Sequence, residues 1–187
     1  IVDKFFMDYG DTQGAGVTGV NLGAAKLGVG VFTGDTFDSQ MAVGKSAKKL
    51  NVDLSDISVN EGGKLRVLLT AVSGEGLAGG NSGSALAVSH NQSNFIVKGL
   101  TNTVFLQTST GHAEVGGKFQ NLTGVGKKVT RIADTINWQS GPFGGQAVVG
   151  VQTNQDDGSS VKRTDSSLGG RISYAMNQNF KWLVEAG

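Results

Sequence analysis

The sequence predicts an all-β fold, an up-and-down antiparallel sheet of the transmembrane β-barrel type, of which the chain forms a part. Three observations predict it. Polar and aliphatic residues alternate along segments of about ten residues, and tight turns alternate with long polar loops between these segments. Only 17% of the 187 residues are charged, against about 25% in a typical soluble protein. A strand with this alternation has water on one side and an apolar medium on the other.

Each predicted strand rests on a two-residue period. In Lys49–Ser55 every odd-numbered residue is polar and every even-numbered residue is aliphatic. Lys64–Leu69, Gln146–Gln152 and Phe180–Glu185 repeat this arrangement with few exceptions, and helical spacing is confined to the short connector Ser93–Asn102. In chain order, the predicted strands are Ala25–Thr33, Lys48–Ile57, Lys64–Ser73, Ser84–Asn91, Thr103–Ser109, Lys128–Trp138, Gly145–Thr153, Gly169–Ala175 and Phe180–Ala186.

The connections between these strands alternate in length. Tight turns are predicted at Asn60–Gly63, Ser140–Gly144 and Asn177–Asn179. The connector Gln92–Asn102 departs from the rhythm, because a short turn is expected at this point. A sheet with short turns at one end and long loops at the other is typical of outer-membrane barrels. The predicted long, polar loops are Gly34–Ala47, Gly74–Gly83, Thr110–Gly126 and Asn154–Leu168.

Composition and charge exclude several classes of function. Lysine plus arginine is 16 and aspartate plus glutamate is 15, so the formal net charge is +1. A nucleic-acid partner is therefore not expected, because it requires a basic surface. The absence of cysteine excludes disulfides and thiolate metal sites, and two histidines, His90 and His112, make a histidine metal site unexpected. We expect neither a metal nor another cofactor.

Enzymatic activity is not expected either. Carboxylates such as Asp3 and Asp8 could be paired as in a glycosidase, but such a pair requires a defined separation and one raised pKa, which sequence spacing does not provide. The serines of Ser82–Ser84, taken with His90, lack the Gly-x-Ser-x-Gly turn that would expose a nucleophile. We therefore assign no catalytic residue.

Two interpretations of the pattern stay open at this point. A soluble β-sandwich or an exported adhesin-like sheet without a channel would also show a two-residue period and glycine-rich turns. Trp138, Tyr174 and Trp182, on aliphatic faces near strand ends, favour the barrel, because interfacial aromatic residues lie there. The chain starts at Ile1 and ends within a predicted strand, so we expect it to be part of a longer protein.

Several segments follow one another as in a known family. Ile1–Asp8 is an acidic and aromatic segment, and it leads into Gly14–Val17 and then Ala25–Leu27. This order resembles the central part of the maltoporin family of sugar-specific outer-membrane channels, over most of the 187 residues. Further matching segments are Gly62–Leu65, Gly83–Ser93, Arg131–Asp134 and Trp182–Gly187.

The resemblance implies a complete barrel of about eighteen strands in the lipid of the bacterial outer membrane. It also implies assembly as a homotrimer and facilitated diffusion of maltose and maltooligosaccharide-type sugars. Residues 1–187 would then be a single segment of this barrel. The resemblance implies no cofactor.

The resemblance also implies a constriction loop folded into the lumen near residues 1–16. Asp3 and Asp8 match its acidic positions and would accept hydrogen bonds from sugar hydroxyls. Phe5 matches the aromatic residue that narrows the pore, at a position where the family usually has tyrosine. Met7 stands where an aromatic residue is expected, which leaves the preferred sugar open.

Three further residues are candidates for lining the lumen. Leu86 falls near a position where the resemblance implies an aromatic residue. Arg66 shares the polar side of its strand with Lys64, and a lipid-facing arginine would be costly. Arg131 is interpreted in the same way.

Overall fold

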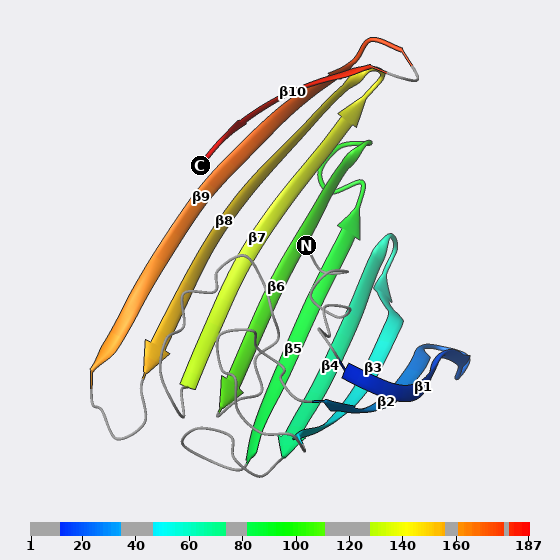
Figure 1. The fold of residues 1–187 in the computed structure, drawn as a ribbon. Helices are drawn as coiled ribbons and strands as arrows, with labels where there is room; N and C mark the ends of the chain where they lie inside the picture. Colours follow the sequence, from blue (N-terminus) through cyan, green and yellow to red (C-terminus); the bar gives the residue numbers. More distant parts are fainter. Residues whose placement is uncertain (1–11, 35–46, 74–81, 111–127, 156–160, 178–179) are drawn as a thin grey trace.

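The computed structural model describes residues 12–34, 47–73, 82–110, 128–155, 161–177 and 180–187. They form one ten-stranded antiparallel sheet whose strand order follows the sequence, as Figure 1 shows. The prediction of an all-β, up-and-down antiparallel fold is confirmed. No helix that could cross a membrane occurs in these ranges. The strands are β1 (Thr12–Asn21), β2 (Lys26–Gly34), β3 (Ala47–Asn60), β4 (Gly63–Ser73), β5 (Ser82–Ser93), β6 (Leu100–Thr110), β7 (Lys128–Ser140), β8 (Phe143–Gln155), β9 (Lys162–Ala175) and β10 (Lys181–Ala186).

The nine predicted strands correspond to β2–β10, and β1 was missed. The sequence of β1 is rich in glycine, which weakens the two-residue pattern. Residues 12–16, predicted to belong to the constriction loop, form the first half of this strand. The start of β9 was also predicted wrongly. The strand begins at Lys162 rather than Gly169. Its first six residues are polar on both faces, so their sequence resembles a loop.

The connector between β5 and β6 is a turn and not a helix. It occupies residues 94–99, and the amide of Phe95 donates a hydrogen bond to the carbonyl of Leu100 at 2.9 Å. Like the connections β1–β2, β3–β4, β7–β8 and β9–β10, it is short. The predicted alternation of short and long connections therefore extends over the whole sheet.

Antiparallel pairing places the side chains on two unlike faces. In β6, Phe105, Gln107 and Ser109 are buried, while the alternate residues Leu106 and Thr108 are exposed. We call the face that carries Gln107 the polar face and the face that carries Leu106 the apolar face. Exposed aliphatic residues on the apolar face include Val31, Leu50, Leu69, Leu106, Ile132, Val149, Val151, Leu168, Ile172 and Val184.

A β-bulge in β3 keeps the apolar face continuous. Val52 and Leu54 are even-numbered, whereas Ile57 and Val59 are odd-numbered, so a regular strand would place these pairs on opposite faces. Leu54 and Ile57 are three positions apart in β3 but pair with residues two positions apart in β4. Asp56 absorbs the extra position with a φ of 57°. The bulge therefore returns Ile57 to the apolar face.

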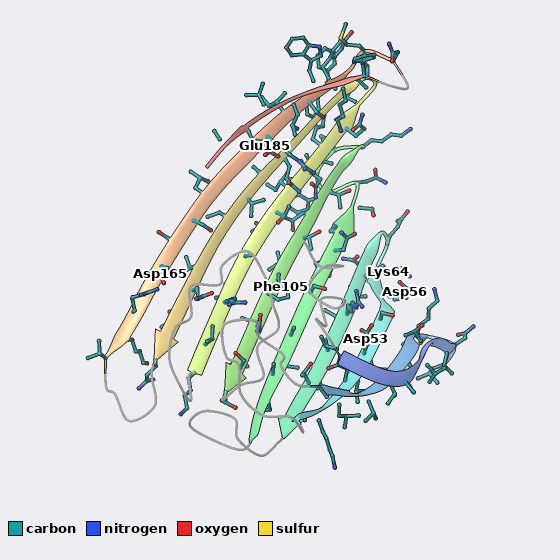
Figure 2. All side chains as sticks on the ribbon, in the orientation of Figure 1. Asp53, Asp56, Lys64, Phe105, Asp165 and Glu185 are labelled. Carbon is teal, nitrogen blue, oxygen red and sulfur yellow. The ribbon has the colours of Figure 1, made fainter. Side chains whose placement is uncertain are left out.

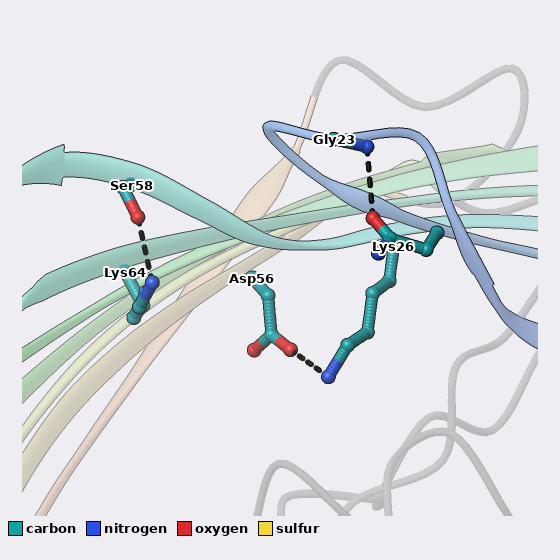
Figure 3. Close-up of polar contacts among 6 residues, drawn as sticks. Gly23, Lys26, Asp56, Ser58 and Lys64 are labelled. Atoms are coloured by element: carbon teal, nitrogen blue, oxygen red, sulfur yellow. Dashed lines mark hydrogen bonds and ion pairs between the residues drawn. The ribbon is translucent and has the colours of Figure 1, made fainter.

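Polar contacts surround this bulge near the short-turn end of the sheet. The Lys26 ammonium lies 2.6 Å from the Asp56 carboxylate, across β2 and β3. The Lys64 ammonium donates a hydrogen bond to the Ser58 hydroxyl at 2.6 Å, across β3 and β4, and Figure 3 shows both contacts. The half-exposed Lys26 side chain thus pairs with the carboxylate that the bulge introduces.

Gly99 packs the β5–β6 turn against the end of β7, and this contact yields a first prediction. Its φ is +85°, and an added Cβ would lie 2.6 Å from the carbonyl oxygen of Gln139. We expect Gly99→Ala to lower the free energy of unfolding by about 1–2 kcal/mol, from the left-handed backbone and from the overlap. Urea-induced unfolding in detergent micelles, followed by tryptophan fluorescence, measures this loss.

The matched control is Gly141→Ala in the β7–β8 turn. Gly141 also has a positive φ, +54°, but an added Cβ would meet no atom within 4 Å. Gly141→Ala is therefore expected to lower the free energy of unfolding by less than Gly99→Ala does. Equal losses at the two glycines would contradict the packing role of Gly99.

Candidate functional site

The polar face carries the candidate site, and an arginine–aspartate pair lies on its β3–β4 side. Arg66 donates two hydrogen bonds to Asp53, from Nε to Oδ1 at 2.9 Å and from Nη2 to Oδ2 at 2.7 Å. The two side chains retain 26% and 23% exposure. Beside them the buried Thr70 hydroxyl donates to Asn51 Oδ1 at 2.9 Å. The paired geometry holds Arg66 in one orientation on this face.

A row of long polar side chains crosses the same face near its long-loop end. Gln107, Arg131 and Gln152 are direct neighbours on β6, β7 and β8, with exposures of 1%, 4% and 5%. Arg131 Nε donates a hydrogen bond to Gln152 Oε1. Gln107 Oε1 is buried and accepts no hydrogen bond from the described residues. Next to Gln152, on β9, lies Asp165.

Charged pairs on β9 and β10 are more exposed. Arg163 lies 3.1 Å from Asp165, with side-chain exposures of 62% and 49%. Arg171 lies 4.0 Å from Glu185, with exposures of 49% and 61%. Figure 2 shows Asp165 and Glu185 toward one side of the sheet, Asp53 toward the other and Phe105 between them. Positive and negative groups are thus distributed across the whole polar face.

A hollow of about 200 Å³ lies on this face near the short-turn end. The hydroxyl of Thr101, the amide of Asn137, the guanidinium of Arg171 and the hydroxyl of Ser173 contribute to its lining, with Lys181. These groups can donate and accept hydrogen bonds. Among the described residues, no cluster of three or more His, Cys, Asp or Glu side chains could hold a metal ion.

Aromatic side chains gather on the apolar face at its short-turn end. Trp138, Phe143, Tyr174 and Trp182 are 40%, 48%, 40% and 67% exposed. The rings of Phe143 and Tyr174 lie 4.8 Å apart between centroids. The predicted position of Trp138, Tyr174 and Trp182 on the apolar face, near strand ends, is confirmed. Tyrosine and tryptophan prefer a boundary between an apolar medium and water.

The structure separates the residues that the sequence grouped as lumen candidates. Arg66 and Arg131 lie on the polar face, whereas Leu86 pairs with Leu69 and Thr108 on the apolar face and is 38% exposed. Grouping Leu86 with the two arginines is therefore wrong, because its even-numbered position in β5 points to the opposite side. The predicted constriction residues Asp3, Phe5 and Asp8 lie outside the described residues.

Sequence reasoning missed the buried row of Gln107 and Gln152 beside Arg131. A signal was present, because Gln152 occupies the polar position of a strand that was predicted correctly. The sequence did not give the register of the strands. Register depends on the lengths of the turns and loops, and it decides which residues of β6 and β8 lie beside Arg131. Alternation alone shows which face a residue takes, but not its partner across strands.

Comparison with models of known protein families finds a match along the whole chain. The family model described as LamB porin matches residues 1–187. No curated protein matches the chain. The match therefore covers every residue of the polar and apolar faces.

Proposed function

This chain belongs to the LamB porin family, and from this premise we propose that it forms part of the wall of a channel for maltose and maltodextrin-like sugars. Porins of this family are sugar-specific channels of the bacterial outer membrane and not enzymes. The proposed transport is facilitated diffusion, in which the sugar moves down its own gradient. Maltose and maltodextrins as the transported sugars are part of this proposal, whereas the family match by itself supports a sugar-specific porin.

One observation supports the channel most strongly, namely the exposure of the apolar face. Leu69, Ile132 and Val149 are 50%, 54% and 50% exposed, although a soluble sheet would cover such a surface with a second layer. Hydrocarbon is the environment that suits this face, and water suits the polar face. An exported adhesin-like sheet would need a different cover for the same aliphatic residues.

The chemistry of the polar face fits a sugar. A sugar ring has a rim of hydroxyls, which need donors and acceptors, and the charged pairs of Arg66 with Asp53 and Arg171 with Glu185 offer both. No covalent step is required. Binding at each site has to be weak enough for the sugar to leave, which suits partly exposed groups spread over several strands.

We extend the proposal to the constriction. Asp3 and Asp8 would accept hydrogen bonds from the sugar, and Phe5 would narrow the pore and contact the apolar face of the ring. We also propose that the protein assembles as a homotrimer. A trimer that resists SDS and dissociates on heating would support this assembly, and a monomer in detergent by light scattering would contradict it.

Planar-bilayer recordings test the channel and its substrate together. The whole protein that contains this chain is expected to conduct ions, and maltooligosaccharides are expected to block this current reversibly. Block by maltooligosaccharides but not by sucrose-sized sugars of other linkage would support the named substrate. Conductance that no sugar reduces would contradict sugar specificity, and a lack of conductance would contradict the channel.

A substitution at Phe5 tests the constriction. We expect Phe5→Ala to raise the single-channel conductance, because the side chain would no longer narrow the pore. The apparent affinity for a blocking maltooligosaccharide should fall between about twofold and tenfold, through loss of the aromatic contact. Phe143→Ala is the control, since Phe143 lies on the apolar face. Equal effects of the two substitutions would refute the assigned role of Phe5.

A further inference from the structure

One row of polar side chains follows the apolar face at its long-loop end. Ser84, Thr110, Lys128, Gln155 and Lys162 are successive neighbours on β5, β6, β7, β8 and β9. The Ser84 and Thr110 hydroxyls are hydrogen-bonded at 3.2 Å. We call these five residues the rim row. Its members point to the same side as Leu106 and Ile132, because each lies an even number of residues from the aliphatic positions of its strand.

A second row lies directly inside the rim row. Thr108, Thr130, Thr153 and Thr164 are neighbours on β6, β7, β8 and β9. We call these four residues the threonine row. Beyond it the aliphatic part of the face begins. On β6–β9 the apolar face therefore ends, at the long-loop side, in two layers of hydroxyl, amide and ammonium groups.

The charged side chains in and beside the rim row are all positive. Lys48, at the start of β3, points to the same side as Lys128 and Lys162, because it precedes the exposed Leu50 by two positions. All three lysines are exposed, and none forms an ion pair with a described carboxylate. No aspartate or glutamate of the described residues occupies the rim row or the threonine row. At the opposite end, the same face carries aromatic residues instead.

An apolar hollow lies next to the rim row. Its volume is about 380 Å³, and Leu50, Leu69, Ala71 and Leu86 line it. Ser84 of the rim row borders the same hollow. A surface that joins such a hollow to hydroxyl and ammonium groups matches a molecule with hydrocarbon chains and a polar, anionic headgroup.

We propose that the rim row and the threonine row bind the headgroup of a phosphorylated glycolipid, with one of its acyl chains in the hollow. Lys128 and Lys162 are two strands apart, about 10 Å, so one headgroup can reach both ammonium groups with its phosphates. The threonine hydroxyls and Gln155 suit sugar hydroxyls, which a zwitterionic phospholipid lacks. This inference rests on the proposed function, because it requires the apolar face to lie in a bilayer.

Competition between two lipids tests the inference on the whole protein in detergent. The probes are a diphosphorylated disaccharide glycolipid and phosphatidylcholine, and native mass spectrometry measures which lipid stays bound. The wild-type protein is expected to prefer the glycolipid. Lys128→Gln and Lys162→Gln should each reduce this preference about fivefold, and the double variant about thirtyfold. Lys98→Gln is the control, because Lys98 lies in the β5–β6 turn at the opposite end.

Each outcome decides the inference. Loss of preference in the double variant with full preference in Lys98→Gln supports it. An equal affinity of the wild-type protein for both lipids, or an unchanged preference in the double variant, overturns it. Bilayer conductance of the same samples separates the two proposals. A conducting protein without lipid preference contradicts only the lipid site, and a lipid-selective protein without conductance contradicts only the channel.

Discussion

Replacing Val52 by arginine is expected to destabilise the protein in a bilayer, lowering its free energy of unfolding by about 2–4 kcal/mol. Val52 lies on the apolar face between Val29 and Leu69, and none of its nearest neighbours on that face is acidic. A guanidinium at this position would have to enter hydrocarbon or distort the bilayer around it. Folding into phosphatidylcholine vesicles at graded urea concentrations, followed by tryptophan fluorescence, measures the loss.

Val148→Arg is the matched control for this prediction. Val148 has a similar partial exposure, but it lies on the polar face, between Thr135 and Gly169. The same new charge would there meet water and polar side chains, so a smaller loss is expected. If both variants lost the same stability, or if Val52→Arg folded normally, the apolar face would not be in contact with lipid.

The second large effect is expected at Arg131. Arg131→Met removes the donor that serves the buried Gln152 Oε1. The lost hydrogen bond is charge-assisted, and the buried oxygen that accepted it loses a donor that water does not readily replace. We therefore expect the free energy of unfolding in micelles to fall by about 2–3 kcal/mol.

Two further variants isolate the cause. Arg163→Met makes the same substitution on the same face, but Arg163 is 62% exposed and its ion pair with Asp165 is solvated. Its loss should stay below about 1 kcal/mol. In Arg131→Met/Gln152→Leu both partners are apolar, and the double variant should lose less than the sum of the single losses. Strict additivity would contradict the coupling of Arg131 with Gln152.

Alternation predicted most of the sheet because the side-chain period of a strand is two residues and one face of this sheet is aliphatic. The strand around Lys49–Ser55 was predicted well for this reason. The pattern failed at β1, where glycine removes the contrast between faces, and at the start of β9, where both faces are polar. It also missed the bulge at Asp56, although the change from even to odd aliphatic positions in β3 signals it.

The candidate site could be predicted only in part. Arg66 and Arg131 were placed on the polar side correctly, because arginine at a polar position of an alternating strand indicates the wetted face. Leu86 was chosen from a resemblance and not from its own strand, whose alternation places it with Leu69 on the apolar face. The partners Asp53 and Gln152 lie on other strands, and sequence spacing does not select them.

The sequence by itself determined the two faces, since hydrophobic periodicity acts along a single strand and requires no knowledge of its neighbours. Only the tertiary structure decided which residues meet across strands, because hydrogen-bonded register depends on turns and bulges. Register joins Arg131 to Gln152 and aligns Lys128 with Gln155 and Lys162. The alternating pattern therefore predicts a sheet with a polar face and an apolar face. The register decides which side chains meet on each face.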